Sequence, residues 1–246
     1  MPHSRILILA GTGEARELAN ALHAKGVDVV TSFAGVTKDP LLPAGEIHVG
    51  GFGGTTGFVE YLAKSKFTSV VDATHPFAAQ MSRQAHEACL QLHMPLLRLE
   101  RPAWNPQTGD RWQHVTSIQE AADILPTDAR VLLTTGHRGL EAFLDRADLS
   151  GVIRTIEPPK TALPPHWTLL LDRPPHRLDD EMRLLESAHI THLVCKNAGG
   201  AATAAKLEAA RNAGVAVVII ARPEKPKCHV ISSVAEALLG IMGKPG

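Results

Sequence analysis

The chain has 246 residues, which is near the upper size for one α/β domain and enough for two small ones. Its 25 basic and 25 acidic side chains cancel to a formal net charge of zero, and only 4% of its residues are aromatic. This balance and this shortage of stacking side chains argue against a nucleic-acid partner. Three scattered cysteines without metal-ligand spacing argue against a disulfide framework and predict no metal site.

The apolar stretches of the chain are short. The longest, residues 215–221, is far too short to cross a bilayer, and its β-branched residues indicate a buried parallel strand. The apolar start of the chain is also brief, and it leads into a glycine turn without the cleavage pattern of a signal peptide. We therefore expect a cytoplasmic protein with no membrane segment.

Short β-branched runs alternate with helix-length segments, as in parallel sheets with crossover helices. In the first half, strands are expected at residues 6–10, 27–32, 47–49, 70–72 and 96–99, and helical stripes around 18–22 and 77–92. In the second half, strands are expected at residues 131–134, 152–156, 193–195 and 215–221, and a helix around 201–213. The pattern predicts an α/β fold.

The two halves of the chain also echo one another. RILILAG at 5–11 matches RVLLTTG at 130–136, and segments 70–102 and 193–223 share a plan that ends in Arg-Pro. Any two βαβ units look partly alike, so the echo does not establish a duplication. It predicts two Rossmann-like (flavodoxin-like) parallel-sheet halves with an inter-domain cleft. The predicted domains are an N-terminal nucleotide-binding domain, 1–112, and a C-terminal Rossmann-like domain, 113–246.

A glycine turn follows the first expected strand and opens a helix. At Gly11-Thr12-Gly13-Glu14, backbone N–H groups and the helix dipole could hold a phosphate group. Arg16 replaces the third glycine of the GxGxxG pattern, so a turn without a ligand stays open. The turn also resembles the phosphate loop of flavodoxins, which leaves FMN as an alternative cofactor.

The end of the second expected strand bears on the choice of nucleotide. NAD sites usually place an acid there, which accepts a hydrogen bond from the ribose 2′-hydroxyl. Here Ser32 and Ala34 stand at that position, and Lys38 follows. No carboxylate would repel a 2′-phosphate, so this segment favours NADPH, although a chain that binds no nucleotide here stays open.

A glycine cluster spans residues 49–55. It lacks the Lys-Ser/Thr ending of a Walker loop, so an ATPase is excluded. Gly51 and Gly53 could lie flat against a cofactor or could pack at a tight turn, and the sequence does not decide between the two.

Asp72-Ala73-Thr74-His75 follows the fourth expected strand. Thr74 or Asp72 could simply cap the next helix. Alternatively, Thr74 and His75 face a ligand, and the histidine donates a hydrogen bond or a proton. Because they lie at the end of a strand, Thr74 and His75 are candidates for catalytic residues.

Ligands of open α/β sheets bind beyond the carboxyl ends of the strands. Lys196 and Asn197 stand there before small residues, where a cation and an amide can hold a carboxylate. A helix cap and a solvated charge stay open as alternatives. The residues expected to bind a substrate are Asp72, Arg98, Arg101, Thr135, Gly136, Lys196, Asn197 and Arg222.

Several enzyme classes are excluded by missing residues. Short-chain dehydrogenases need Tyr-x-x-x-Lys, but Ser65 stands at the lysine position after Tyr61, the only tyrosine. The chain has no GxSxG or HExxH motif. With no nucleophile evident in the protein, a cofactor would carry the reaction.

Six segments together resemble the precorrin-6A reductase family. They are ILILAGTGEARELA (6–19), VGGFGGTTGFVEYL (49–62), VVDATHPFAAQMS (70–82), PLLRLERPAW (95–104), LLTTG (132–136) and KNAGG (196–200), in the order of the family. The resemblance implies NADPH as hydride donor and a macrocyclic tetrapyrrole substrate, precorrin-6A, which is reduced at one ring double bond to precorrin-6B in cobalamin biosynthesis. A non-catalytic nucleotide-binding module stays open as an alternative of another class.

Overall fold

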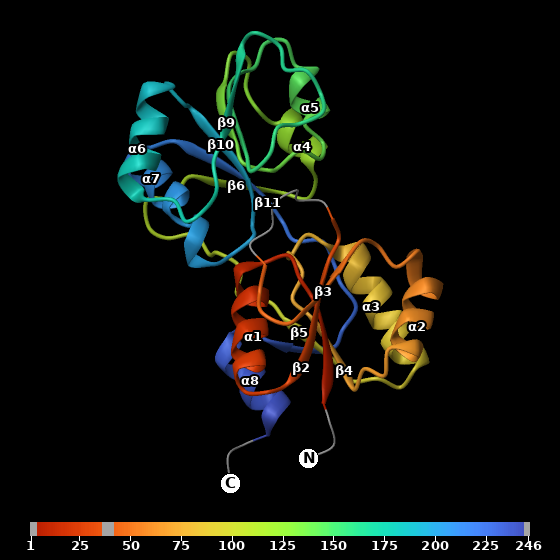
Figure 1. The fold of residues 1–246 in the computed structure, drawn as a ribbon. Helices are drawn as coiled ribbons and strands as arrows, with labels where there is room; N and C mark the ends of the chain where they lie inside the picture. Colours follow the sequence, from red (N-terminus) through yellow and green to blue (C-terminus); the bar gives the residue numbers. More distant parts are fainter. Residues whose placement is uncertain (1–3, 36–41, 244–246) are drawn as a thin grey trace. The chain divides into compact units, whose positions relative to one another are not determined.

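The computed structural model describes residues 4–35 and 42–243. The chain divides into two compact units, Met1–Pro102 together with Pro223–Gly246, and Ala103–Arg222. Each unit is built on one six-stranded sheet whose paired strands are all parallel (Figure 1). The prediction of two Rossmann-like parallel-sheet halves is therefore confirmed. No helix within the described ranges combines the length and the apolar character that crossing a membrane requires.

The first unit has the strand order of dinucleotide-binding folds, β3-β2-β1-β4-β5-β12, which reverses between β1 and β4. Leu7 and Leu9 of β1 pack under α2 and α3, whereas Ile6 and Ile8 pack under α1 and α8, so helices cover both faces (Figure 1). Its elements are β1 (Arg5–Leu9), α1 (Gly13–Ala24), β2 (Asp28–Phe33), β3 (Glu46–Val49), α2 (Gly54–Lys64), β4 (Ser69–Asp72), α3 (Ala79–Gln91), β5 (Leu96–Leu99), β12 (His229–Ile231) and α8 (Val234–Met242).

The second unit repeats this order as β9-β8-β7-β10-β11-β6, so β7 has the place that β1 has in the first unit. The similar sequence segments of the two halves therefore occupy equivalent positions in their sheets. β1 corresponds to β7, and β4 and β5 correspond to β10 and β11. Its elements are β6 (Trp112–Val115), α4 (Ile118–Asp123), β7 (Arg130–Leu133), α5 (Glu141–Leu144), β8 (Ser150–Thr155), β9 (Trp167–Leu171), α6 (Leu178–Ser187), β10 (His192–Lys196), the 3₁₀ helix η1 (Ala201–Thr203), α7 (Ala205–Asn212) and β11 (Ala216–Ile220).

In each sheet, one edge strand comes from the part of the chain that directly follows the other sheet's strands. β6 follows β5 but pairs with β11 in the second sheet, and β12 follows β11 but pairs with β5 in the first sheet. The helices after them begin alike: Ser117 Oγ accepts from the Glu120 amide, and Ser233 Oγ accepts from the Glu236 amide. Each glutamate also accepts a hydrogen bond from the backbone nitrogen of the residue before its serine. Two equivalent βα segments have therefore changed places.

This exchange moves the domain boundaries. The second predicted domain, 113–246, differs from the second observed unit, Ala103–Arg222, at both its first and its last residue. β6 begins at Trp112 within a unit that starts at Ala103, and Pro223–Gly246 belongs to the first unit. The reason is the pairing of β12 with β5, since which sheet an edge strand joins is set by tertiary contacts and not by its own sequence.

Candidate active site

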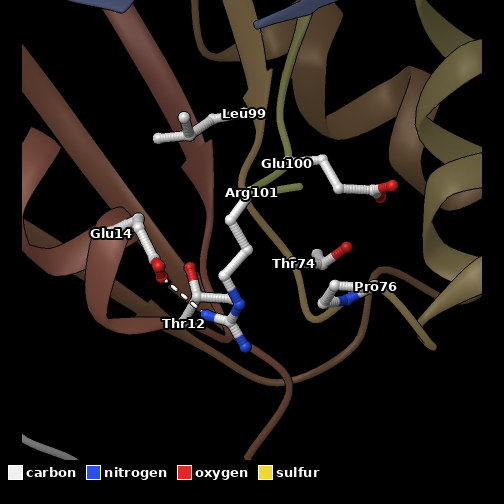
Figure 2. A pocket seen from close by; sticks show the side chains of 7 residues that line it. All are labelled: Thr12, Glu14, Thr74, Pro76, Leu99, Glu100 and Arg101. Atoms are coloured by element: carbon white, nitrogen blue, oxygen red, sulfur yellow. Dashed lines mark hydrogen bonds and ion pairs between the residues drawn. The ribbon is translucent and has the colours of Figure 1, made fainter. Parts of the chain in front are cut away.

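A small hollow lies at the carboxyl ends of β1, β4 and β5, where the strand order of the first sheet reverses (Figure 2). The hollow is too tight to enclose even a water molecule, so it is a surface depression and not a cavity of ligand size. The residues that line it are Thr12, Glu14, Thr74, Pro76, Leu99, Glu100 and Arg101.

The glycine turn after β1 is held by Thr12. Its Oγ1 accepts from the Ala15 amide at 3.1 Å, which caps α1, and donates to the Ala73 carbonyl at 3.0 Å. A Cβ on Gly11 would lie 3.0 Å from the His75 backbone nitrogen, so the close approach of the β4 loop requires glycine there. A Cβ on Gly13 would meet nothing within 4 Å. The second glycine thus leaves open space at the start of α1.

Asp72 and Arg98, both expected to bind substrate, form a buried pair. Asp72 is fully buried, and its Oδ2 accepts from Arg98 Nε at 3.2 Å. Its Oδ1 accepts from the backbone nitrogen and the hydroxyl of Thr74 at 3.2 and 2.7 Å. Burial alone would raise the pKa of Asp72, but hydrogen bonds and the charges of Lys225 and Arg98 hold it below its usual value. The Asp72 carboxylate therefore holds both Thr74 and Arg98 in place through hydrogen bonds.

His75 follows Thr74 in the same loop and is half-buried. Its Nδ1 accepts from the Phe77 amide at 3.2 Å. A ring nitrogen that accepts carries no proton, so the neutral imidazole has its proton on Nε2. The loop thus sets the tautomer of His75 and leaves Nε2–H as the group that could donate.

Arg101 lies beside the glycine turn. Its Nη1 is 2.8 Å from Glu14 Oε2, and this ion pair joins the end of β5 to the first turn of α1 (Figure 2). The sequence placed Arg101 with the substrate-binding residues and Glu14 with the cofactor-binding residues. The structure brings the two together.

At the end of β2, Ser32 is bonded to a residue that the sequence analysis did not single out. Ser32 and His48 are partners in the parallel pairing of β2 with β3, and Ser32 Oγ lies 3.1 Å from His48 Nδ1. The His48 ring stacks on Phe52 at 4.9 Å between centroids. No local sequence pattern marks this contact, because it depends on the register of β3 against β2. Ala34 is exposed nearby, and Lys38 lies outside the described residues.

The glycine cluster makes a tight contact with α2, the helix that follows it. A Cβ on Gly57 would lie 1.8 Å from the Phe52 carbonyl oxygen, so the chain packs tightly there. Gly51 and Gly53 differ, because a Cβ on either would meet nothing within 4 Å. Gly53 has a φ of +77° directly before α2, a conformation that favours glycine.

In the second unit, three of the expected residues gather at the ends of β10 and β11. Lys196 Nζ donates to the Thr135 carbonyl at 2.6 Å. The Asn197 amide both accepts from the Trp104 backbone nitrogen at 2.8 Å and donates to its carbonyl at 3.0 Å. The Arg222 guanidinium donates to the carbonyls of residues 197 and 198 at 2.9 and 3.1 Å. Asn197 and Arg222 thus hold the loop that follows Lys196.

Two of the cysteines, Cys89 and Cys195, are buried thiols. Burial raises the pKa of the Cys89 thiol to about 12 and that of the Cys195 thiol to about 11, so both stay protonated at neutral pH. Across residues 4–35 and 42–243, no group of three or more His, Cys, Asp or Glu side chains could hold a metal ion.

The fold and the glycine turn define a protein of Rossmann-like α/β architecture. The family model described as precorrin-6x reductase CbiJ/CobK matches residues 5–240. The chain belongs to this family of oxidoreductases.

Individual relatives agree with that assignment. A precorrin-6A reductase of Rhodococcus erythropolis is 46% identical over 96% of both chains, and one of Mycobacterium tuberculosis is 42% identical over 98% of this chain and 99% of its own. A cobalt-precorrin-6A reductase of Priestia megaterium is 27% identical over 97% of this chain and 98% of its own. A solved structure described as CobK precorrin-6A reductase has a TM-score of 0.91 and 40% identity, and covers 98% of this chain and 97% of that one.

Proposed function

We propose that the chain reduces precorrin-6A to precorrin-6B with NADPH, as a step of cobalamin biosynthesis. The observation that supports a nucleotide cofactor is the open space at Gly13. It lies at the start of α1, at the point where the strand order reverses. Bound NADPH would supply the hydride. The three unpaired thiols fit a reducing compartment, so we place the reaction in the cytoplasm.

The first unit would bind the cofactor. Its phosphates would lie against the glycine turn at Gly11, Thr12, Gly13 and Glu14, with Arg101 beside them, and its ribose near Ser32, Ala34 and Lys38. Gly51 and Gly53 would line the same cofactor. Thr74, held by Asp72, and His75, whose Nδ1 accepts from the Phe77 amide, would orient the reacting ring. His75 Nε2–H would donate a hydrogen bond or a proton.

The second unit would bind the tetrapyrrole. Lys196, with Thr135 and Gly136, would hold a carboxylate arm, and Asn197 and Arg222 would fix the loop that positions Lys196. Arg98, buried against Asp72, would act in the first unit by supporting the loop at Thr74.

Anaerobic incubation with precorrin-6A and NADPH tests the proposal. We expect the absorbance of NADPH to fall together with a change in the tetrapyrrole spectrum, one NADPH for each substrate. A yellow purified protein would indicate bound FMN and overturn the cofactor assignment. Binding of NADPH without its consumption would instead favour a non-catalytic nucleotide-binding module.

Cofactor preference should depend on the end of β2. Ala34→Asp adds a carboxylate at an exposed position, where it would repel a 2′-phosphate and accept a hydrogen bond from a 2′-hydroxyl. We expect kcat/KM for NADPH to fall by about tenfold and that for NADH to be kept or raised. Ala34→Asn, of the same size but uncharged, is the control. Equal kcat/KM values of the wild type for NADPH and NADH would contradict the preference.

The two glycines of the turn should behave differently when replaced. Gly13→Val points into open space, so the fold should persist while NADPH affinity falls by about tenfold or more. Gly11→Ala should lower the melting temperature instead, because its Cβ meets the His75 backbone. Circular dichroism and a fluorescence titration with NADPH distinguish the two effects. Normal NADPH binding by Gly13→Val would remove the turn from the cofactor site.

A further inference from the structure

Two carboxylates line the hollow at the carboxyl ends of β1, β4 and β5. They belong to Glu14, in the first turn of α1, and to Glu100, directly after β5 (Figure 2). The cofactor proposed for this place carries several negative charges on its phosphates, and like charges at close range repel one another. An acid beside such a cofactor therefore has to be compensated by a cation.

Each of the two carboxylates has an ion pair of its own. Arg101 Nη1 lies 2.8 Å from Glu14 Oε2, and Lys225 Nζ lies 2.5 Å from Glu100 Oε2. The side chains of the first pair are 18% and 29% exposed, whereas that of Lys225 is only 5% exposed. Water and salt screen a pair with so little exposure only weakly. The charge balance between Lys225 and Glu100 therefore matters more than that of a surface pair.

The backbone next to Lys225 is held against β5. Lys225 belongs to the segment that returns to the first unit after the second unit. Arg98 Nη1 donates to the Pro226 carbonyl at 3.0 Å, and the Glu100 amide donates to the Ile231 carbonyl at 2.9 Å. The returning segment thus presents the Lys225 ammonium to Glu100 from a fixed position.

We propose that Lys225 is a positioning residue of the cofactor site, which holds the Glu100 carboxylate and cancels its charge so that the cofactor phosphates can bind. This role rests on the proposed NADPH cofactor. The competing role is that the pair only fastens the returning segment to β5. Charge compensation predicts opposite effects on NADPH affinity when the acid or the base is removed, whereas fastening predicts the same effect for both.

Fluorescence titrations with NADPH separate the two roles without turnover. Lys225→Met removes the ammonium that compensates Glu100, so the dissociation constant of NADPH should rise by about tenfold. Glu100→Gln removes the carboxylate and keeps the ammonium, so the dissociation constant should fall severalfold. The double variant lacks both charges and should bind NADPH nearly as the wild type does.

Two further variants are the controls. Lys227→Met removes an equal charge from an exposed position of the same segment and should leave NADPH affinity unchanged. Lys225→Arg keeps the charge and should bind NADPH nearly as the wild type does. Weaker binding by both Lys225→Met and Glu100→Gln, or unchanged binding by both, would overturn the proposed role of Lys225.

Other outcomes are also decisive. If circular dichroism shows that Lys225→Met does not fold, Glu100→Gln alone decides, because only charge compensation predicts tighter binding in that variant. A wild type that binds no NADPH would remove the proposed cofactor, and the role of Lys225 with it. A wild type that binds NADPH, with Glu100→Gln binding more weakly, would overturn the role of Lys225 and leave the cofactor in place.

Discussion

Lys196→Met should raise KM for the tetrapyrrole by about tenfold or more and leave the NADPH dissociation constant nearly unchanged. A hydrogen bond between charged groups contributes roughly 1.5–3 kcal/mol, and each 1.4 kcal/mol is about a factor of ten in affinity. Lys196 belongs to the second unit and bonds the Thr135 carbonyl there, whereas the glycine turn belongs to the first unit. Steady-state kinetics with each ligand varied in turn measure both effects.

The pH dependence of this interaction has a definite sign. Because burial and the charge of Arg138 hold the pKa of Lys196 below that of an ordinary lysine, its charge is lost at a lower pH. Substrate affinity should therefore decline as the pH rises into the alkaline range. Lys196→Arg, which keeps its charge, should lack this decline. A Lys196→Met protein that loses NADPH affinity but binds tetrapyrrole normally would reverse the assignment of the two units.

Asp72→Asn should have the largest effect on stability. The substitution leaves the Arg98 guanidinium buried without its carboxylate, and breaking a buried ion pair on one side costs about 3–5 kcal/mol. Asp28→Asn is the matched control, because Asp28 pairs with Arg5 at the surface, where such a pair contributes about 0–1 kcal/mol. Urea unfolding of both variants measures the difference. Equal unfolding free energies would show that Asp72 does not support Arg98.

The Asp72 carboxylate should also make the free energy of unfolding depend on pH in the acidic range. The pKa of Asp72 is lowered in the folded state, so Asp72 stabilises the fold above its unfolded pKa and loses this effect as the pH falls through the folded value. The loss should occur below the usual range of an aspartate. Asp72→Asn should lack this part of the acid dependence, which unfolding curves at neutral and acidic pH would show.

The central strands could be predicted from the sequence, and three edge strands could not. β1, β4, β7 and β10 are almost wholly buried, so their apolar runs are continuous. β6, β9 and β12 lie at sheet edges and are only partly buried. The short segments of β6 and β12 carry no long apolar run, which explains why no strand is predicted there. β9 does contain three consecutive leucines, 169–171, but its strand is not predicted either.

The features of the candidate site also fall into two groups, those that a local sequence pattern predicts and those that depend on tertiary contacts. The turn from Gly11 to Glu14 is a local pattern, and the structure places it at the start of α1 as predicted. The contact of Ser32 with His48 depends on strand register, and that of Asn197 with Trp104 joins residues 93 positions apart. Neither can be inferred from neighbouring residues. The ion pair of Lys225 with Glu100 likewise becomes visible only when the surroundings of both side chains are known.

The exchange of β6 and β12 affects how the chain is made. A ribosome releases β5 before the second unit, but the strand that pairs with its outer edge, His229–Ile231, emerges only after that unit. Until then the first sheet has an open edge, and α1 lacks the apolar cover of α8. The N-terminal unit therefore cannot finish folding before the rest of the chain has been synthesised. The first unit completes its sheet and its helical cover only after the whole of the second unit has been synthesised.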